Sequence, residues 1–172
     1  MKTMVRLVTL AIAATTYAGC GAGAVGEDTP AAEDLHVAQS QNAVVSCYAG
    51  TCDFQDSSTM GCDTDATTVA SSSVRINSTG AVIGTIAIRY SAACRAVWAR
   101  TSSTTLSPYY LRAEIYRGGS TNQSASPSPV TALKSSMFGV VTSGTSFRAV
   151  GYAGNSYNDL SYATGSVSAT VF

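Results

Sequence analysis

Few side chains in this sequence can carry out catalysis, and their positions exclude most familiar reactions. The single histidine, His36, lies in an acidic segment without apolar periodicity. A catalytic triad or a histidine-based zinc site is therefore not expected in the folded part of the chain. Lys134 is the only lysine after Lys2, and no signature of serine–lysine catalysis surrounds it. We expect no catalytic residues, and we expect that the protein is not an enzyme.

One group of carboxylates is a candidate metal site. Four aspartates fall within a short stretch of chain: Asp53, Asp56, Asp63 and Asp65. Calcium takes about six to eight oxygen ligands, which carboxylates and carbonyls can supply, but the spacing is not that of an EF-hand. The alternative, which we favour, is that these residues cap turns through Asx hydrogen bonds. No cofactor is expected.

A second candidate for function is a segment between Gly151 and Gly165 that is rich in Tyr, Ser, Gly and Asn, the composition of recognition loops. Its candidate binding residues are Tyr152, Asn155, Tyr157, Asn158 and Tyr162. An envelope polysaccharide or a protein is the expected partner. The alternative is a strand–loop–strand unit whose tyrosines cover the edge of a core.

A third candidate is an aromatic–basic group formed by Arg89, Arg95, Trp98 and Arg100. Trp98 and Arg100 would share one face of a strand, so a cation–π contact and a ligand platform are possible. The structural alternative is that Trp98 packs against a disulfide made by Cys94, which lies on the same face.

The N-terminus has the pattern of an export signal. Lys2 and Arg6 precede an apolar run from Leu7 to Ala18, which is too short to span a membrane. The following Tyr17-Ala18-Gly19-Cys20 resembles a bacterial lipobox, although Leu is usual where Tyr17 stands. This predicts a signal peptide over 1–19, a lipid on Cys20 that binds the membrane, and a tether over 20–44. The alternative is secretory cleavage after Ala24, which would give a soluble secreted protein.

The remaining cysteines predict two disulfides in an oxidising compartment. Of the five cysteines, lipidation of Cys20 leaves Cys47, Cys52, Cys62 and Cys94. Cys47 and Cys52 flank a short segment that suits a tight turn, which leaves Cys62 to pair with Cys94. Sequence alone permits three pairings.

The region 45–172 has the pattern of a β domain. Residues 81–90, 95–103 and 109–117 alternate between apolar and polar side chains, and strands are also plausible at 73–77, 137–142, 145–153 and 161–171. The segment 118–129 has the composition of a loop. A short helical turn is possible near Asp63. We therefore predict an all-β, disulfide-stapled sandwich or barrel with at most a short helical turn.

Within 45–103, the pattern Cys47-x4-Cys52, Gly61-Cys62, Asp65-Ala66-Thr67 and Arg89-Tyr90-Ser91-x2-Cys94-x-Ala96-x-Trp98-Ala99-Arg100 resembles a bacterial family of exported proteins of unknown function. Phe54 stands where the family pattern has Gly, and Asp56-Ser57 where it has Asp-Pro. The resemblance implies the module boundary and the disulfides but no activity. Residues after 103 lie outside it.

Charge and composition limit the functions further. After Val45 the chain has eight Lys or Arg and six Asp or Glu, too weak a basic excess for nucleic-acid binding. We expect an extracytoplasmic, lipid-anchored protein of the cell envelope that acts as a non-enzymatic binding or structural module. One alternative is an envelope hydrolase that uses carboxylates, with or without calcium. Another is a disulfide-stapled inhibitor of a secreted enzyme.

Overall fold

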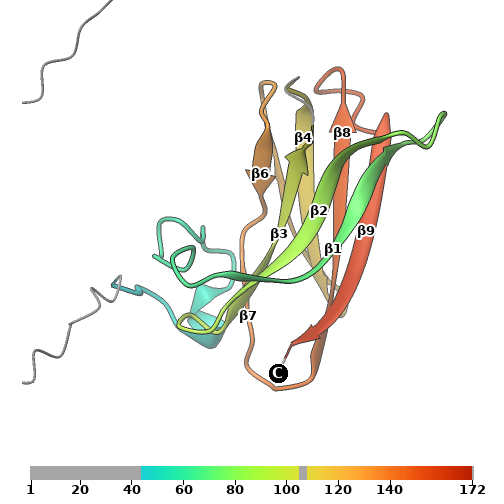
Figure 1. Cartoon of the computed structure of the whole chain (residues 1–172). Coiled ribbons are helices and arrows are strands. Elements are labelled where there is room, and N and C mark those ends of the chain that lie inside the picture. The colour runs from blue at the N-terminus through green and yellow to red at the C-terminus, as the bar shows by residue number, and fades with distance from the viewer. Residues whose placement is uncertain (1–43, 105–107, 172) are drawn as a thin grey trace, which may run out of the picture. The chain divides into compact units, whose positions relative to one another are not determined.

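The computed structural model describes residues 44–104 and 108–171, and these residues form an almost entirely β structure (Figure 1). The elements are η1 (Ala49–Cys52), β1 (Thr67–Ile76), β2 (Val82–Ser91), β3 (Ala96–Ser103), β4 (Tyr110–Arg117), β5 (Ser120–Ala125), β6 (Ala132–Lys134), β7 (Phe138–Gly139), β8 (Thr145–Gly154) and β9 (Ala163–Val171). The predicted all-β class is confirmed. The short helical turn lies at η1, and the expectation of one near Asp63 is wrong.

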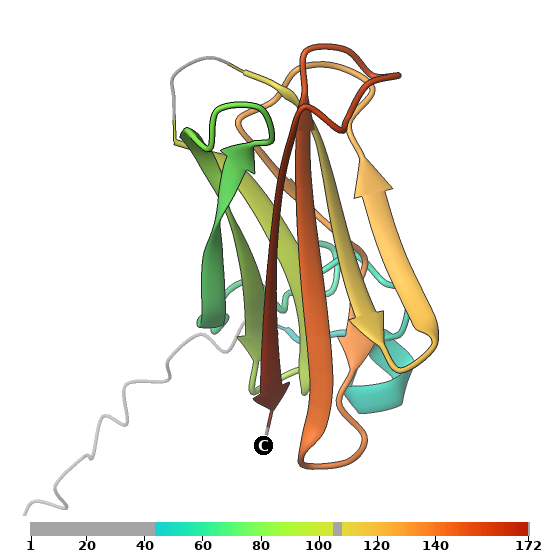
Figure 2. The same cartoon turned by 90° about the vertical axis from the view of Figure 1, so that its right-hand side faces the viewer.

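The strands form one antiparallel sheet in the order β5-β4-β8-β9-β1-β2-β3-β6, with β7 paired to β3. The sheet curls on itself, as the two views in Figures 1 and 2 show. Tyr109, just before β4, and Val130, just before β6, exchange two backbone hydrogen bonds of 3.2 and 2.8 Å. These bonds join the β4 and β6 regions, so the fold is a nearly closed barrel.

The interior of the barrel is filled by the alternating apolar side chains that the sequence pattern indicates. In β4, Leu111, Ala113 and Ile115 are buried while the residues between them face outward. Ile86 and Ile88 of β2 are also fully buried. The interior cluster comprises Val74, Ile83, Ile86, Ile88, Val97, Ala99, Leu111, Ala113, Ile115, Phe138, Val140, Phe147, Ala149, Ala153, Ala163 and Val171.

The first half of β3 is buried on both faces. Val97 and Ala99 point into the barrel, whereas Ala96 and Trp98 point outward and are equally buried. The outer face is covered by residues 44–66, which we call the disulfide layer. The cover ends at Arg100, the first exposed residue of the strand.

The disulfide layer contains a second, smaller apolar cluster. Its disulfides join Cys47 to Cys52 and Cys62 to Cys94, the pairing that the spacing favours, and all four Sγ atoms lie within 4.8 Å of one another. Trp98, Ala96 and Met137 pack against these sulfurs from the barrel side. The structural alternative for Trp98 is therefore confirmed.

Backbone contacts also attach the layer to the sheet. The amide of Ala49 donates to the carbonyl of Cys94 at 2.7 Å, and the amide of Phe54 donates to the carbonyl of Met137 at 2.9 Å. Gly139 of β7 lies so close to η1 that an added Cβ would be 1.8 Å from the carbonyl oxygen of Ala49. Only glycine allows this approach.

Two strands were not expected from the sequence. The segment 118–129, expected to be a loop, contains β5, and the short β6 was not expected at all. In β5 the single buried side chain is Asn122, so this edge strand has no apolar alternation to mark it. Among the residues that the structure describes, no helix has the length and apolarity needed to cross a membrane.

Candidate ligand-binding sites

Arg112 is the centre of the first candidate site. It points outward from β4 and lies directly across from Tyr152 of β8, with its guanidinium carbon 4.2 Å from the centroid of the Tyr152 ring. Its Nε lies 3.1 Å from Oε1 of Glu114, although the N–H is not aligned with that oxygen. The terminal nitrogens of Arg112 have no hydrogen-bond partner among the described residues.

Glu114 is the acidic partner of this arginine. It is only 5% exposed, and its carboxylate contacts Arg112 and Tyr116. The Tyr116 hydroxyl donates to Oε2 of Glu114 at 2.5 Å, and this bond together with burial raises the pKa of Tyr116. Arg112 and Glu114 thus form an ion pair whose carboxylate is buried.

A tight loop brings two of the predicted recognition residues beside Arg112. Ser156 and Asp159 form a bridge, with Tyr157 and Asn158 exposed at the tip between them. The loop folds back on β8 at Gly154, where an added Cβ would be 1.8 Å from the carbonyl oxygen of Asp159.

Together these elements form two adjoining hollows of about 260 and 380 Å³, which share Arg112, Tyr157 and Leu160. We call them the arginine–tyrosine groove. The other residues that line it are Tyr152, Asn158, Asp159, Ser161, Gln123, Ser124 and Ala125.

The groove offers the groups that sugar recognition needs. The Tyr157 side chain is exposed and provides an apolar surface, and guanidinium, amide and carboxylate groups line the groove with it. Of the predicted residues, Tyr152, Tyr157 and Asn158 line the groove. Asn155 is exposed but outside the lining, and Tyr162 packs partly against the barrel core. The last result agrees with the structural alternative for that tyrosine.

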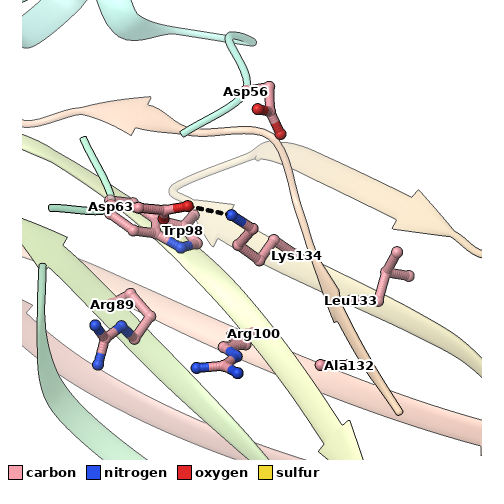
Figure 3. A pocket seen from close by; sticks show the side chains of 8 residues that line it. All are labelled: Asp56, Asp63, Arg89, Trp98, Arg100, Ala132, Leu133 and Lys134. Atoms are coloured by element: carbon pink, nitrogen blue, oxygen red, sulfur yellow. Dashed lines mark hydrogen bonds and ion pairs between the residues drawn. The ribbon is translucent and has the colours of Figure 1, made fainter. Parts of the chain in front are cut away.

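The second candidate site lies where the disulfide layer ends on the outer face of β2, β3 and β6 (Figure 3). It is a hollow of about 510 Å³, and we call it the Trp98 pocket. The residues that line it are Asp56, Asp63, Arg89, Trp98, Arg100, Ala132, Leu133 and Lys134. Strand pairing places Arg89 directly opposite Trp98 and Arg100 directly opposite Lys134.

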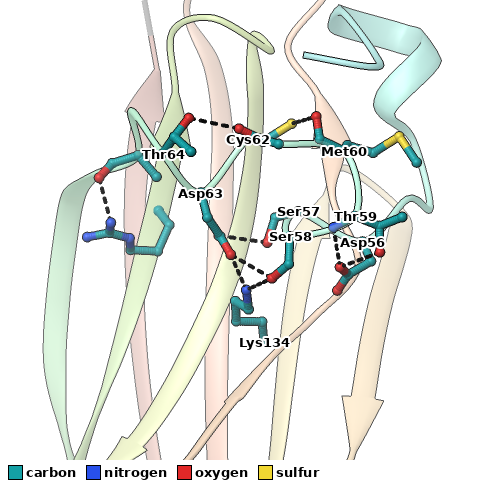
Figure 4. Close-up of polar contacts among 12 residues, drawn as sticks. Asp56, Ser57, Ser58, Thr59, Met60, Cys62, Asp63, Thr64 and Lys134 are labelled. Carbon is teal, nitrogen blue, oxygen red and sulfur yellow. Dashed lines mark hydrogen bonds and ion pairs between the residues drawn. The ribbon is translucent and has the colours of Figure 1, made fainter. Parts of the chain in front are cut away.

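The rim of this pocket is held by a polar network around Asp63 (Figure 4). Asp63 accepts hydrogen bonds from Ser57 at 2.9 Å and Ser58 at 2.7 Å and forms an ion pair with Lys134. Partial burial opposes ionisation of the Asp63 carboxyl, but the hydrogen bonds from Lys134 and the two serines outweigh it and lower its pKa.

The other aspartates of the calcium hypothesis each have different partners. Asp53 pairs with Arg117 at 2.9 Å and accepts from the Gly139 amide at 2.7 Å. Asp56 caps its own turn, because the Thr59 amide donates to it at 2.9 Å.

Asp65 joins the layer to the turn between β2 and β3. It accepts from Ser91 at 2.5 Å and from the Ala93 amide at 2.8 Å. Burial alone would raise its pKa, but these hydrogen bonds lower it. The four carboxylates thus do not converge among the described residues; the group of potential metal ligands found there is the four disulfide-bonded cysteines.

The aromatic–basic group is divided between two places. Arg89, Trp98 and Arg100 line the pocket, whereas Arg95 lies over the Tyr48 ring. The cation–π contact of Arg100 with Trp98 that a shared strand face would permit is not among the ring contacts of the described residues.

Each site also contains residues that distant strands bring to it and that the sequence does not predict. Arg112 and Gln123 come to the groove from β4 and β5, and Lys134 comes to the pocket from β6. No local signal marks them, because only the pairing of strands far apart in sequence places them there.

A family described as protein of unknown function (DUF2690) matches residues 50–148. The chain therefore belongs to this family, whose match extends well beyond the motif at 45–103. The matched segment includes every residue that lines the Trp98 pocket, whereas Tyr152, Tyr157 and the rest of their loop lie beyond it. No curated protein and no solved structure matches the chain.

Proposed function

We propose that this member of the DUF2690 family is a non-enzymatic binding module of the bacterial cell envelope, and that it recognises polysaccharide through the arginine–tyrosine groove. The observation that carries the proposal is the position of Arg112. Its terminal N–H groups have no partner among the described residues, and it stacks on Tyr152 and lines the groove together with the exposed Tyr157. Sugar hydroxyls can accept from such a guanidinium while the tyrosine supports the apolar face of the ring.

The non-enzymatic part of the proposal rests on the chemistry of the described residues. The cysteines form disulfides, and the aspartates of the disulfide layer are bound to serines, backbone amides, Arg117 or Lys134. In the groove, Asp159 accepts a hydrogen bond from the Ser161 hydroxyl at 2.8 Å, so its carboxylate stabilises its own turn. The alternatives are a carboxylate-dependent hydrolase and an inhibitor of a secreted enzyme.

The location is proposed from the N-terminal signal, which lies outside the described residues together with Cys20. Export is supported by the two disulfides, because such bonds persist in oxidising compartments. We propose that a lipid on Cys20 anchors the protein and that the segment 20–44 is its tether. Cys20→Ser should abolish labelling with palmitate and release the protein from sedimented membranes. A variant that is still labelled and still sediments would contradict the anchor.

Glycan binding is tested with the full-length chain purified in detergent and applied to an array of envelope polysaccharides. Binding should fall at least tenfold in Tyr157→Ala. The matched control is Tyr48→Ala, because Tyr48 is 55% exposed and Tyr157 is 52% exposed, but Tyr48 lies in the disulfide layer. Equal loss in both variants, or no binding at all, would contradict the groove as the site.

The same samples separate binding from hydrolysis. We expect bound glycans to be recovered intact. Release of shortened products that stops in Asp63→Asn or Asp65→Asn would favour the hydrolase. Inhibition of a secreted enzyme without glycan binding would favour the inhibitor.

A further inference from the structure

The Trp98 pocket has an excess of positive charge that its own acids do not neutralise. Of its two carboxylates, Asp63 is paired with Lys134 and Asp56 accepts from the Thr59 amide and hydroxyl. Among the described residues, the Arg89 side chain donates only to neutral oxygens, the Thr68 hydroxyl at 2.7 Å and the Ala66 carbonyl at 2.5 Å. The side chain of Arg100 is exposed and has no hydrogen bond or ion pair with any described residue. Two guanidinium groups in the pocket therefore have no anionic partner among the described residues.

These two arginines lie on one face of the sheet, and Trp98 is a neighbour of both. Arg89 is directly opposite Trp98 across β2 and β3, and Arg100 is two residues beyond Trp98 on the same strand face. Arg89 and Arg100 are therefore diagonal neighbours on paired strands, and such positions are about 7–8 Å apart. Figure 3 shows the two arginines, Trp98 and the Asp63–Lys134 pair around one hollow. Arg100 is also directly opposite Lys134, so like charges adjoin there.

Trp98 contributes an unusual feature of its own. The residue is 1% exposed, and its indole Nε1 has no hydrogen-bond partner within the described residues. Buried N–H groups without partners are rare, and each calls for a physical explanation. Arg100 and Lys134 are long side chains that line the same pocket as Trp98.

We propose that the Trp98 pocket binds a small ligand that carries an oxyanion, either a carboxylate or a phosphate, through Arg89 and Arg100. Guanidinium groups present paired N–H donors that match the oxygens of both anions. The bound anion relieves the repulsion between Arg100 and Lys134 and brings an acceptor close to the indole N–H. A volume of about 510 Å³ accommodates a ligand of monosaccharide size. A metal ion is disfavoured, because both carboxylates already have donors.

This site is separate from the arginine–tyrosine groove, and its test does not depend on glycan binding there. Trp98 is the only tryptophan of the chain, so its fluorescence reports directly on the pocket. The full-length chain in detergent is titrated with inorganic phosphate and, separately, with glucuronate. Glucose serves as the uncharged control.

We expect a saturable change in fluorescence with at least one of the two anions and none with glucose, and we expect added NaCl to weaken it. Binding of phosphate or of glucuronate shows whether the ligand's acidic group is a phosphate or a carboxylate. Arg100→Gln should weaken binding about tenfold without changing the melting temperature, because the Arg100 side chain has no hydrogen bond or ion pair with any described residue. The matched control is Arg148→Gln, which removes an exposed guanidinium that lies over the Tyr116 ring, outside the pocket; it should leave the affinity unchanged. The proposal is overturned if neither anion changes the fluorescence saturably, or if Arg100→Gln binds as the unaltered chain does.

Discussion

The barrel interior and the disulfide layer are two apolar clusters on opposite faces of β3, and different forces hold them. Val97 and Ala99 join an interior of aliphatic and phenylalanine side chains drawn from most strands of the sheet. Ala96 and Trp98 join a small cluster built mainly of cysteines. The first cluster is stabilised by the burial of apolar area, whereas the second has little such area and depends on covalent bonds.

The two regions also differ in backbone strain. The non-glycine residues with positive φ among those described are Ala49, Phe54 and Arg95, at 47°, 64° and 47°. The first two lie in the disulfide layer, and the third follows Cys94. Left-handed conformations are unfavourable for residues with a Cβ, so the layer tolerates strain that the barrel strands do not contain. The disulfides keep the layer in place despite this strain.

The two candidate sites are therefore supported in different ways. The arginine–tyrosine groove combines side chains of β4, β5 and β8, which the barrel core supports, with those of the loop that carries Tyr157. The Trp98 pocket has one wall on the sheet and one on the disulfide layer. Breaking the disulfides should therefore damage the pocket and leave the groove intact.

The largest effect should come from the disulfide that links the layer to the sheet. The Cys62–Cys94 bond spans a sequence separation of 32, and on the chain-entropy model it contributes about 4 kcal/mol to the free energy of unfolding. The Cys47–Cys52 bond spans a separation of 5 and contributes about 2 kcal/mol. The double variant Cys62→Ser/Cys94→Ser should therefore melt at a lower temperature than Cys47→Ser/Cys52→Ser, as measured by circular dichroism. Equal melting temperatures would contradict this difference.

A smaller effect is expected where the layer approaches β7. Gly139→Ala places a Cβ against the Ala49 carbonyl and should lower the free energy of unfolding by about 2 kcal/mol. Gly119→Ala is the matched control, because an added Cβ there meets nothing within 4 Å. Denaturation in urea measures both variants. Equal free energies of unfolding in the two variants would show that η1 is not held closely against β7.

Acid should loosen the layer through Asp63. Its pKa in the folded chain lies below the usual value of 3.8, so its ion pair stabilises the fold above that value. The contribution is lost as the pH falls through the folded-state pKa. The effect should be modest, because the side chains of Lys134 and Asp63 are 28% and 37% exposed.

The urea midpoint of the unaltered chain should fall between about pH 6 and about pH 3, and we expect this fall to be smaller in Asp63→Asn. Asp159→Asn, which alters a carboxylate outside the layer, is the control. An unchanged pH dependence in Asp63→Asn would show that the Asp63–Lys134 pair does not stabilise the layer.

The smallest effect concerns Phe54. Both Phe54→Gly and Phe54→Ala remove the ring contact with Phe138, but only alanine retains the left-handed strain. Phe54→Gly should therefore be more stable than Phe54→Ala by about 1 kcal/mol, the reverse of the usual order. Thermal melts of the two variants give the comparison, and a more stable alanine variant would contradict the assigned conformation.

The sequence predicts the barrel better than it predicts the layer, for a physical reason. Strands such as β2 and β4 have one apolar and one polar face, which their alternation reveals. The layer has no such period, since its shape follows from two disulfides and from turns like that of Asp56. In the sequence, Asp63 belongs to one candidate site, the carboxylate group, whereas Trp98 and Arg100 belong to another, the aromatic–basic group. Their meeting with Lys134 depends on the pairing of β3 with β6, for which the sequence contains no local signal.

The most direct test of this account is amide hydrogen exchange of the full-length chain before and after reduction of the disulfides. We predict that amides of the disulfide layer that are hydrogen-bonded within it, such as those of Ser46, Met60 and Cys62, lose their protection on reduction. Amides of β4, β8 and β9 should remain protected, because the barrel core supports them. A uniform loss of protection in both regions, or a layer that stays protected without its disulfides, would contradict the distinction between a self-supporting barrel and a covalently held layer.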